Sequence, residues 1–169
     1  MNCSQPNRRE LLVLAAMLGL AACQTIPAPG FSAAQRKVLE RNGFVAGEEG
    51  YLLSINNRLL FGYDSSEIEP PKQAMLRDLA RQLAEVGISG AAIEGHASAE
   101  GSAEYNLRLS QRRAEAVRDA LVAGGLQAGR MRVLALGESD PIASNDDPEG
   151  RIQNRRVVII VTPGDALRW

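Results

Sequence analysis

Hydrophobic residues recur along this chain at two spacings, one typical of helices and one typical of strands. Leu76, Leu79, Leu83 and Val86 lie three or four positions apart, as on one face of a helix that Glu69-Pro70-Pro71 opens and Gly87 ends. Short apolar runs between turn residues indicate strands instead. In chain order the pattern predicts a helix from Ser32 to Asn42 that stops at Gly43, strands Tyr51–Ile55 and Arg58–Gly62 joined by a turn at Asn56-Asn57, the helix from Glu69, strand Ala91–Gly95, helix Ser102–Ala123, strand Met131–Leu136, a polar loop from Asp140 to Pro148, and strand Arg156–Thr162.

This order of elements predicts the fold class. From Arg58 onward it reads strand, helix, strand, helix, strand, strand, which favours an α+β two-layer sandwich with helices on one face of a mixed sheet. We find no internal repeat and no second domain. The predicted division of the chain is 1–22 for a signal peptide, 23–31 for an anchored cysteine and tether, 32–57 for a pre-domain helix and hairpin strand, 58–163 for the main domain, and 164–169 for a tail.

The N-terminal apolar stretch has the pattern of an export signal. Arg8 and Arg9 precede Leu11–Leu20, which is too short to span a bilayer, and small residues then lead to Cys23. The run Leu-Ala-Ala-Cys resembles the lipobox of bacterial lipoproteins, in which the cysteine is acylated; the alternative is an ordinary signal that happens to meet a cysteine. Gln24, rather than aspartate, after the cysteine favours the outer membrane. We therefore expect a lipid-anchored protein that faces the periplasm.

Composition narrows the range of functions. The residues are 45% hydrophobic and the net charge is −1, so the chain is expected to be globular and nothing points to nucleic acid. The single histidine, His96, lacks the second His or Cys that a metal site would need and an orienting acid at a recognisable spacing for catalysis with Ser98. We expect no enzyme activity, no metal and no cofactor, and a structural His96 that holds its loop by hydrogen bonds.

Polar side chains interrupt the inward stripe of the predicted helix from Ser102. Asn106, Ser110 and Arg113 share a face, which becomes apolar further along at Val117. Polar groups on a core-facing stripe need partners, and a bound ligand is one source of them. The alternative, which remains open at this stage, is that these side chains serve only the adjoining loops. Arg113 has the planar fork of donors that suits a carboxylate.

Three motifs resemble the OmpA/Pal-type peptidoglycan-associated domain over roughly residues 59–162. They are Ile93-Glu94-Gly95-His96, Tyr105-Asn106-x-x-Leu109-Ser110-x-x-Arg113-Ala114 and Gly150-Arg151-x-x-Asn154-Arg155-Arg156-Val157. The resemblance implies non-covalent binding of the peptide stem of peptidoglycan. In that family an aspartate grips the amine of diaminopimelate and an arginine grips its carboxylate. The family arginine falls on Arg113, Asn106 matches the motif asparagine, and Asp64 and Gly101 would line the pocket.

The chain departs from the family pattern at one position. The family has Gly-His-Thr-Asp where this chain has Gly95-His96-Ala97-Ser98, so a serine stands where the amine-binding acid is expected. Loss of a charge-assisted hydrogen bond predicts an affinity lower by roughly tenfold or more. Glu100 could replace the missing charge, but the interpretation as a solvated loop acid is favoured.

The segment ahead of the domain suggests a second function. The lipobox, residues 31–60 and the C-terminal motif together resemble lipoproteins of an envelope signalling system, in which the lipoprotein captures a small periplasmic repressor and so frees an inner-membrane diguanylate cyclase. By this resemblance Leu39, Phe44 and Tyr51 are candidate partner contacts. The alternative, favoured for each of them, is packing against the chain's own domain.

Overall fold

A computed structural model describes residues 30–62 and 65–166. Three predictions concern residues outside this part of the chain: the signal peptide, the acylated Cys23 and the binding residue Asp64. Among the described residues no helix combines the length and the apolar character that crossing a membrane requires.

The described residues form a mixed sheet of five strands in the order β1-β2-β5-β3-β4. The strands are β1 (Val45–Ala46), β2 (Tyr51–Asn56), β3 (Ala91–His96), β4 (Met131–Gly137) and β5 (Arg156–Val161). β3 and β4 run parallel, because a helix crosses over between them, and the other pairs are antiparallel. β2 pairs with β5 along its whole length, from Tyr51 opposite Val161 to Asn56 opposite Arg156.

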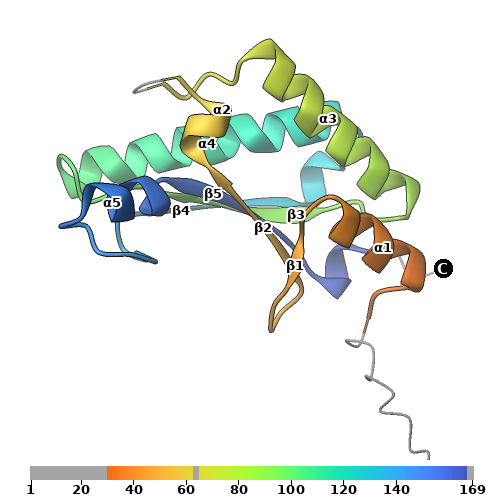
Figure 1. Cartoon of the computed structure of the whole chain (residues 1–169). Helices are drawn as coiled ribbons and strands as arrows, with labels where there is room; N and C mark the ends of the chain where they lie inside the picture. The colour runs from red at the N-terminus through yellow and green to blue at the C-terminus, as the bar shows by residue number, and fades with distance from the viewer. Residues whose placement is uncertain (1–29, 63–64, 167–169) are drawn as a thin grey trace, which may run out of the picture.

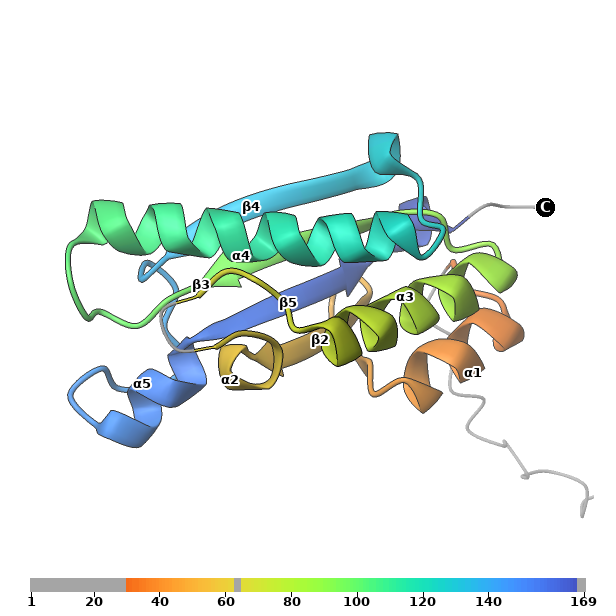
Figure 2. The same cartoon turned by 90° about the horizontal axis from the view of Figure 1, so that it is seen from above.

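Helices cover one face of this sheet, as the sequence predicts. The two long ones are α3 (Pro70–Glu85) and α4 (Ala103–Ala123). The other helical elements are α1 (Ala33–Arg41), α2 (Asn57–Leu60), α5 (Pro148–Asn154) and the short 3₁₀ turns η1 (Ala128–Arg130) and η2 (Pro163–Asp165). α3 and α4 lie side by side above the sheet, and α1 lies beside α3 (Figures 1 and 2). The predicted α+β sandwich is confirmed.

The core lies between these helices and the sheet. Leu76 and Leu83 of α3, Val117 of α4 and Ile93 of β3 are all fully buried there. α4 approaches β3 very closely at Gly95, where an added Cβ would stand 2.2 Å from the backbone oxygen of Ser110. The absent side chain therefore sets the distance between the helix that carries the polar stripe and the strand that leads into the Ser98 loop.

The predicted strand Arg58–Gly62 is wrong. β2 ends at Asn56, whose side chain accepts a hydrogen bond from the Arg58 backbone N–H and so caps a single helical turn, α2. Burial follows the helical spacing, since Asn57 and Leu60 are buried three positions apart. Phe61 then forms one isolated bridge with Ile68 rather than a strand.

The segment ahead of the domain is built into the fold. Leu39, Phe44 and Tyr51 are buried in the hydrophobic core, which corrects their selection as surface contacts for a partner and agrees with the alternative favoured from sequence. The Tyr51 ring meets Phe31 edge-on, with ring centroids 5.4 Å apart. Its hydroxyl donates to Glu40, 3.0 Å away. Burial and this acidic partner raise the pKa of Tyr51.

The expected polar loop from Asp140 to Pro148 leads into a helix that the hydrophobic pattern does not reveal. Asp147 caps α5 by accepting from the Glu149 N–H, and Pro148 occupies the first turn. Asn154, at the end of α5, is fully buried and organises the preceding loop: its side-chain oxygen accepts from the N–H groups of Ile142 and Ala143. α5 therefore lies against the loop and brings its arginines beside the Ser98 loop.

Candidate functional site

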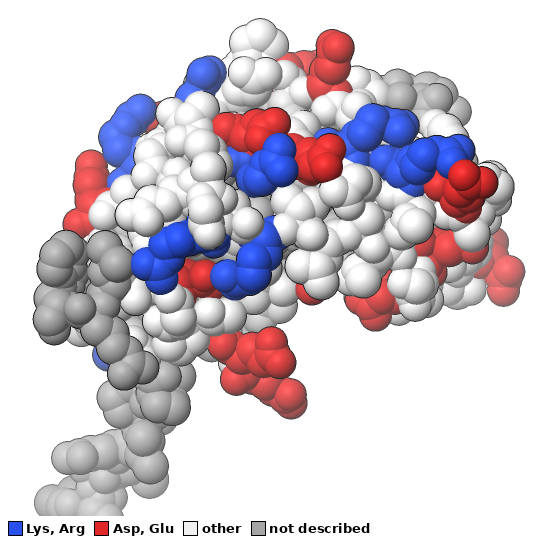
Figure 3. Space-filling model, turned by 180° about the vertical axis from the view of Figure 1, so that it is seen from behind, with Lys and Arg blue, Asp and Glu red and all other residues white. Residues whose placement is uncertain are grey.

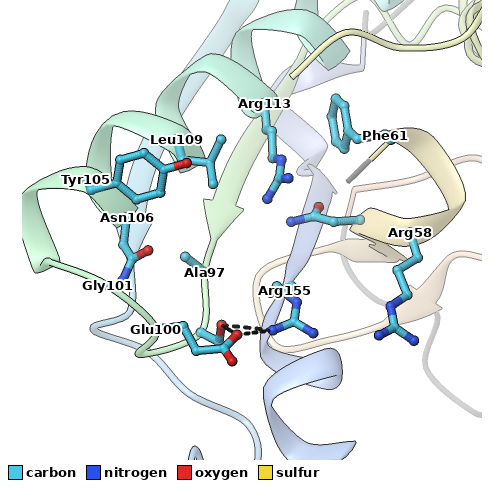
Figure 4. A pocket seen from close by; sticks show the side chains of 13 residues that line it. Arg58, Phe61, Ala97, Glu100, Gly101, Tyr105, Asn106, Leu109, Arg113 and Arg155 are labelled. Atoms are coloured by element: carbon cyan, nitrogen blue, oxygen red, sulfur yellow. Dashed lines mark hydrogen bonds and ion pairs between the residues drawn. The ribbon is translucent and has the colours of Figure 1, made fainter. Parts of the chain in front are cut away.

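A pocket of about 700 Å³ opens where the polar end of α4, the loop after β3, α2 and the start of β5 meet (Figure 4). It contains four of the five residues predicted to bind peptidoglycan; the fifth, Asp64, lies outside the described residues. The lining residues are Asn57, Arg58, Phe61, Gly62, Ala97, Ser98, Glu100, Gly101, Tyr105, Asn106, Leu109, Arg113 and Arg155.

Arg113 is the most enclosed cation of the pocket, with 6% of its surface exposed. α4 places it above the cavity, with its guanidinium directed downward in Figure 4. The Phe61 ring lies under the guanidinium carbon at 5.3 Å, and Arg113 Nε donates to the backbone oxygen of Ser65 at 2.9 Å. A cation stacked on an aromatic ring keeps its charge while its orientation is restricted. The arrangement suits a carboxylate that enters the pocket.

The two other polar residues of the stripe have partners in neighbouring loops. Asn106 donates to the Glu138 carboxylate at 2.6 Å. Ser110 donates to Leu107 O and accepts from the Gly137 N–H, so it fastens α4 to the end of β4. Ser110 therefore fits the alternative of a purely local role, whereas Asn106 also lines the pocket.

Ser98 belongs to a charged network rather than standing alone. Its hydroxyl donates to Glu100 Oε2 and accepts from Arg155 Nη1, each at 3.1 Å. Arg155 Nη1 lies 2.6 Å from the same carboxylate oxygen, and Arg151 Nε lies 3.2 Å from the other. Glu100 is thus paired with two arginines rather than a free replacement for the missing aspartate, while its side chain stays 58% exposed to solvent, as the solvated-acid interpretation expects. Two arginines of the third motif neutralise it.

Glycines shape the loops around the pocket. Gly101 has φ +91°, a conformation that side-chain-bearing residues rarely adopt, and it turns the chain from the Ser98 loop into α4. Gly150 lies so close to Ser144 that an added Cβ would meet the backbone oxygen at 2.1 Å. Together with Asn154, it explains why the third motif combines glycine, asparagine and arginines. The small and amide residues hold the loop, and the arginines bind Glu100.

His96 lies on the opposite face of β3 from α4, outside the pocket lining. Its Nε2 is 3.5 Å from Glu94 and its Nδ1 3.7 Å from Asp140, yet neither nitrogen has a hydrogen-bond partner among the described residues. The expected hydrogen bonds from its ring are therefore wrong. Burial and the nearby Arg156 lower the pKa of His96 to about 4, so the ring is neutral at pH 7. Burial and Asp140 raise the pKa of Glu94.

The other arginines of α4 lie on its outer surface. Arg108 pairs with Glu104, and Arg118 Nη2 lies 2.7 Å from Asp119. In the view of Figure 3 basic and acidic side chains are interspersed. No group of three or more metal-ligating side chains forms within residues 30–62 and 65–166.

The structure adds residues that sequence reasoning did not select. Asn57, Arg58 and Phe61 line the pocket because α2, which replaces the predicted strand, lies at its edge. Arg155 also lines the pocket, although from sequence it is only one position of the third motif. The asparagine cap at Asn56 is the signal that could have identified this turn.

The sequence model of the OmpA family matches residues 60–155. The chain belongs to the OmpA family. This OmpA-family chain is 40% identical to the outer-membrane lipoprotein YfiB of Pseudomonas aeruginosa over 158 residues, which cover 92% of this chain and 94% of that protein. It is also 40% identical to the peptidoglycan-associated lipoprotein of Rhizobium meliloti over 114 residues, 68% of this chain and 65% of that protein.

A solved structure shares the fold. The cell wall anchor of the type VI secretion system (T6SS) from Pseudomonas aeruginosa superposes with a TM-score of 0.60 at 27% identity, covering 76% of this chain and 94% of that one. These proteins are named as lipoproteins or a wall anchor rather than as enzymes. The OmpA-family chain is accordingly a non-enzymatic outer-membrane lipoprotein, as expected from its sequence.

Proposed function

We propose that this OmpA-family chain binds the diaminopimelate-containing peptide stem of peptidoglycan non-covalently, with Arg113 holding a carboxylate of the stem. One observation carries the proposal: a single pocket is lined by Ser98, Gly101, Asn106 and Arg113, the four described residues at which the family resemblance implies ligand contacts. The names of the relatives, a peptidoglycan-associated lipoprotein and a cell wall anchor, support the same ligand class. Lipid on Cys23 would then tie the outer membrane to the wall.

A titration tests the proposal. Residues 24–169, without the lipid anchor, are titrated with a diaminopimelate-containing stem peptide and binding is followed by calorimetry. We expect weak, measurable binding that falls at least tenfold in Arg113→Gln, because a charge-assisted hydrogen bond contributes about 1.5–3 kcal/mol. Arg112→Gln is the matched control, since it removes the same charge from the exposed neighbouring position on α4. Absence of binding by the parent chain contradicts the proposal.

Asp64 is a further proposed contact. It lies outside the described residues, but the next residue in the chain, Ser65, accepts the Nε–H of Arg113. Asp64→Asn is expected to weaken binding of the stem peptide without unfolding the chain, and its thermal unfolding curve provides the check. An unchanged affinity would remove Asp64 from the site.

A second candidate function is capture of a small periplasmic repressor through the segment before the domain. Similarity to YfiB extends over 92% of the chain, so it includes this segment. Deleting the segment is not a usable test, because it would remove β2 and the core residues Leu39 and Tyr51. Among the described residues of this segment, the exposed large apolar side chain is Val45 on the edge strand β1, with 69% of its surface accessible. It replaces the three buried side chains as the candidate contact.

A pull-down from periplasmic extract tests this second function. Val45→Glu is expected to abolish capture of the partner, whereas Ile142→Glu, an equally exposed apolar residue in the loop before α5, leaves it intact. Equal recovery of the partner by both variants would exclude β1 as the contact.

A further inference from the structure

The described wall of the pocket carries more positive than negative charge. Its described lining residues include three arginines, Arg58, Arg113 and Arg155, and one acid, Glu100, whose two oxygens are already engaged by Arg155 and Arg151. The Arg58 guanidinium has no hydrogen bond or ion pair with any described residue. An anionic group entering the pocket is therefore attracted, whereas an ammonium group meets no unpaired carboxylate on the described walls.

One buried polar atom in the lining lacks a partner. The side-chain oxygen of Asn57 is buried and accepts no hydrogen bond among the described residues, although only 4% of this residue is exposed. A buried acceptor without a donor costs free energy, so evolution rarely keeps one without a use. Asn57 differs in this respect from Ser98, whose hydroxyl is fully engaged with Glu100 and Arg155.

The position of Asn57 is fixed by its main chain. Its backbone N–H donates to Arg155 O at 3.0 Å, which ties the start of α2 to the start of β5. Its side-chain nitrogen faces His96 O at 3.5 Å. Exchanging the amide nitrogen and oxygen would bring two oxygens together there, so this contact supports the assigned orientation. The long contact restrains the side chain weakly, and use of the oxygen by a ligand requires a rotation about the side-chain bonds towards the pocket that the residue lines.

We infer that the side-chain oxygen of Asn57 is a ligand contact: a neutral acceptor for an N–H group of the bound peptide. The inference rests on the proposed function and assigns its specificity. The pocket selects its ligand by the carboxylate, and it does not require the ligand's amine to be charged. A neutral acceptor also accepts an amide N–H, and loss of the ammonium charge costs less there than at a carboxylate, because the amide oxygen forms no ion pair with the ammonium.

Substitution of Asn57 tests whether this residue contacts the ligand or only supports the fold. Asn57→Leu removes the unpaired acceptor, so the full chain in detergent is expected to keep or raise its melting temperature while its affinity for the stem peptide falls three- to tenfold. Asn42→Leu is the contrasting control: it removes an amide that is well bonded to Val38 O at the end of α1, and lowers the melting temperature with unchanged affinity. Unchanged affinity in a folded Asn57→Leu chain overturns the inference.

Modified ligands test the specificity directly. The stem peptide is compared with one whose diaminopimelate amine is acetylated and one whose diaminopimelate carboxylate is amidated. The wild-type chain is expected to lose less than threefold on acetylation and more than tenfold on amidation. In Ser98→Asp, which adds an acid to the pocket, acetylation is expected to cost at least tenfold. A steric effect of the acetyl group would weaken binding equally in the wild-type chain and in Ser98→Asp. A larger loss of affinity in Ser98→Asp therefore measures the effect of charge.

The outcomes distinguish the two proposals. If no stem peptide binds, the proposed function fails. If the unmodified peptide binds but acetylation already weakens the wild type tenfold, the proposed function stands and the inference fails. Asp64→Asn then shows whether that acid supplies the charge.

Discussion

Glu100 and Arg155 form an ion pair of 2.6 Å that closes the loop after β3 onto the start of β5. The pair lies in the pocket wall and contacts Ser98, the position at which the family resemblance implies an acid. Its effect is to remove the charge of Glu100 from the pocket and to leave part of the Arg155 donor fork directed at Ser98.

Glu100→Gln is therefore expected to strengthen binding of an anionic stem peptide. With the carboxylate gone, Arg155 and Arg151 lose their acidic partner and the pocket becomes more positive, so affinity rises a few-fold at low salt and the gain shrinks as salt screens it. Calorimetry at two ionic strengths measures this. A weaker affinity would mean that Glu100 itself holds the ligand's amine.

Gly95→Ala is expected to destabilise the fold by about 1–3 kcal/mol, because its Cβ would lie 2.2 Å from the Ser110 backbone oxygen and would push α4 away from β3. Denaturant unfolding measures the change. Gly129→Ala is the control, since an added Cβ there meets nothing within 4 Å. Equal stability of the two variants would contradict the close approach of α4 and β3.

His96 makes stability depend on pH in one window. Burial and the charge of Arg156 lower its pKa from 6.5 to about 4 in the folded chain. Between these values the unfolded chain binds a proton that the folded chain does not. The free energy of unfolding therefore carries the full contribution of the neutral His96 above pH 6.5. It loses about 3 kcal/mol from this group as pH falls towards 4.

The difference between wild type and His96→Gln isolates this contribution from the carboxylates, which titrate in both chains. The free energy of unfolding of His96→Gln is expected to fall less between pH 7.5 and 4.5. An imidazole that titrates near pH 6.5 by NMR would show that the ring is not held neutral.

Asp165 is expected to stabilise the C-terminal turn η2. Burial alone would raise its pKa, but hydrogen bonds from Arg132 and Thr162 outweigh burial and hold the pKa below its usual value. The contribution is present above the unfolded pKa and lost as pH falls through the folded one. Asp165→Asn is expected to cost about 1.5–3 kcal/mol at pH 7 and little at low pH, by urea unfolding. A deficit that persists at low pH would point to packing instead.

The sequence predicts the long helices of the fold because each of them buries a continuous apolar face. α3 and α4 were predicted to within about two residues, since Leu76, Leu83 and Val117 mark helical faces and glycines end them. α2 was read as a strand because a four-residue turn has too few apolar positions to reveal a period. Its signal was the cap at Asn56, a local hydrogen bond rather than a hydrophobic pattern.

The sequence predicts those parts of the site whose residues belong to a single motif. Arg113, Asn106 and Gly101 lie together in the lining of one pocket, because neighbouring positions on one helix and its loop stay together in any fold; their role in binding stays a prediction. The pairing of Glu100 with Arg155 and Arg151 joins segments about fifty residues apart, and nothing in either segment alone reveals it. Asn57 was missed for the same reason.

β2 gives the anchored molecule a mechanical property. Phe31 packs on Tyr51 at one end of this strand, close to where the lipid-bearing segment enters the fold, and Asn57 lines the pocket just past its other end. If the pocket holds a wall ligand as proposed, separation of the membrane from the wall puts tension along β2. The antiparallel ladder with β5 is then loaded in shear, so its hydrogen bonds bear the force together instead of opening one after another.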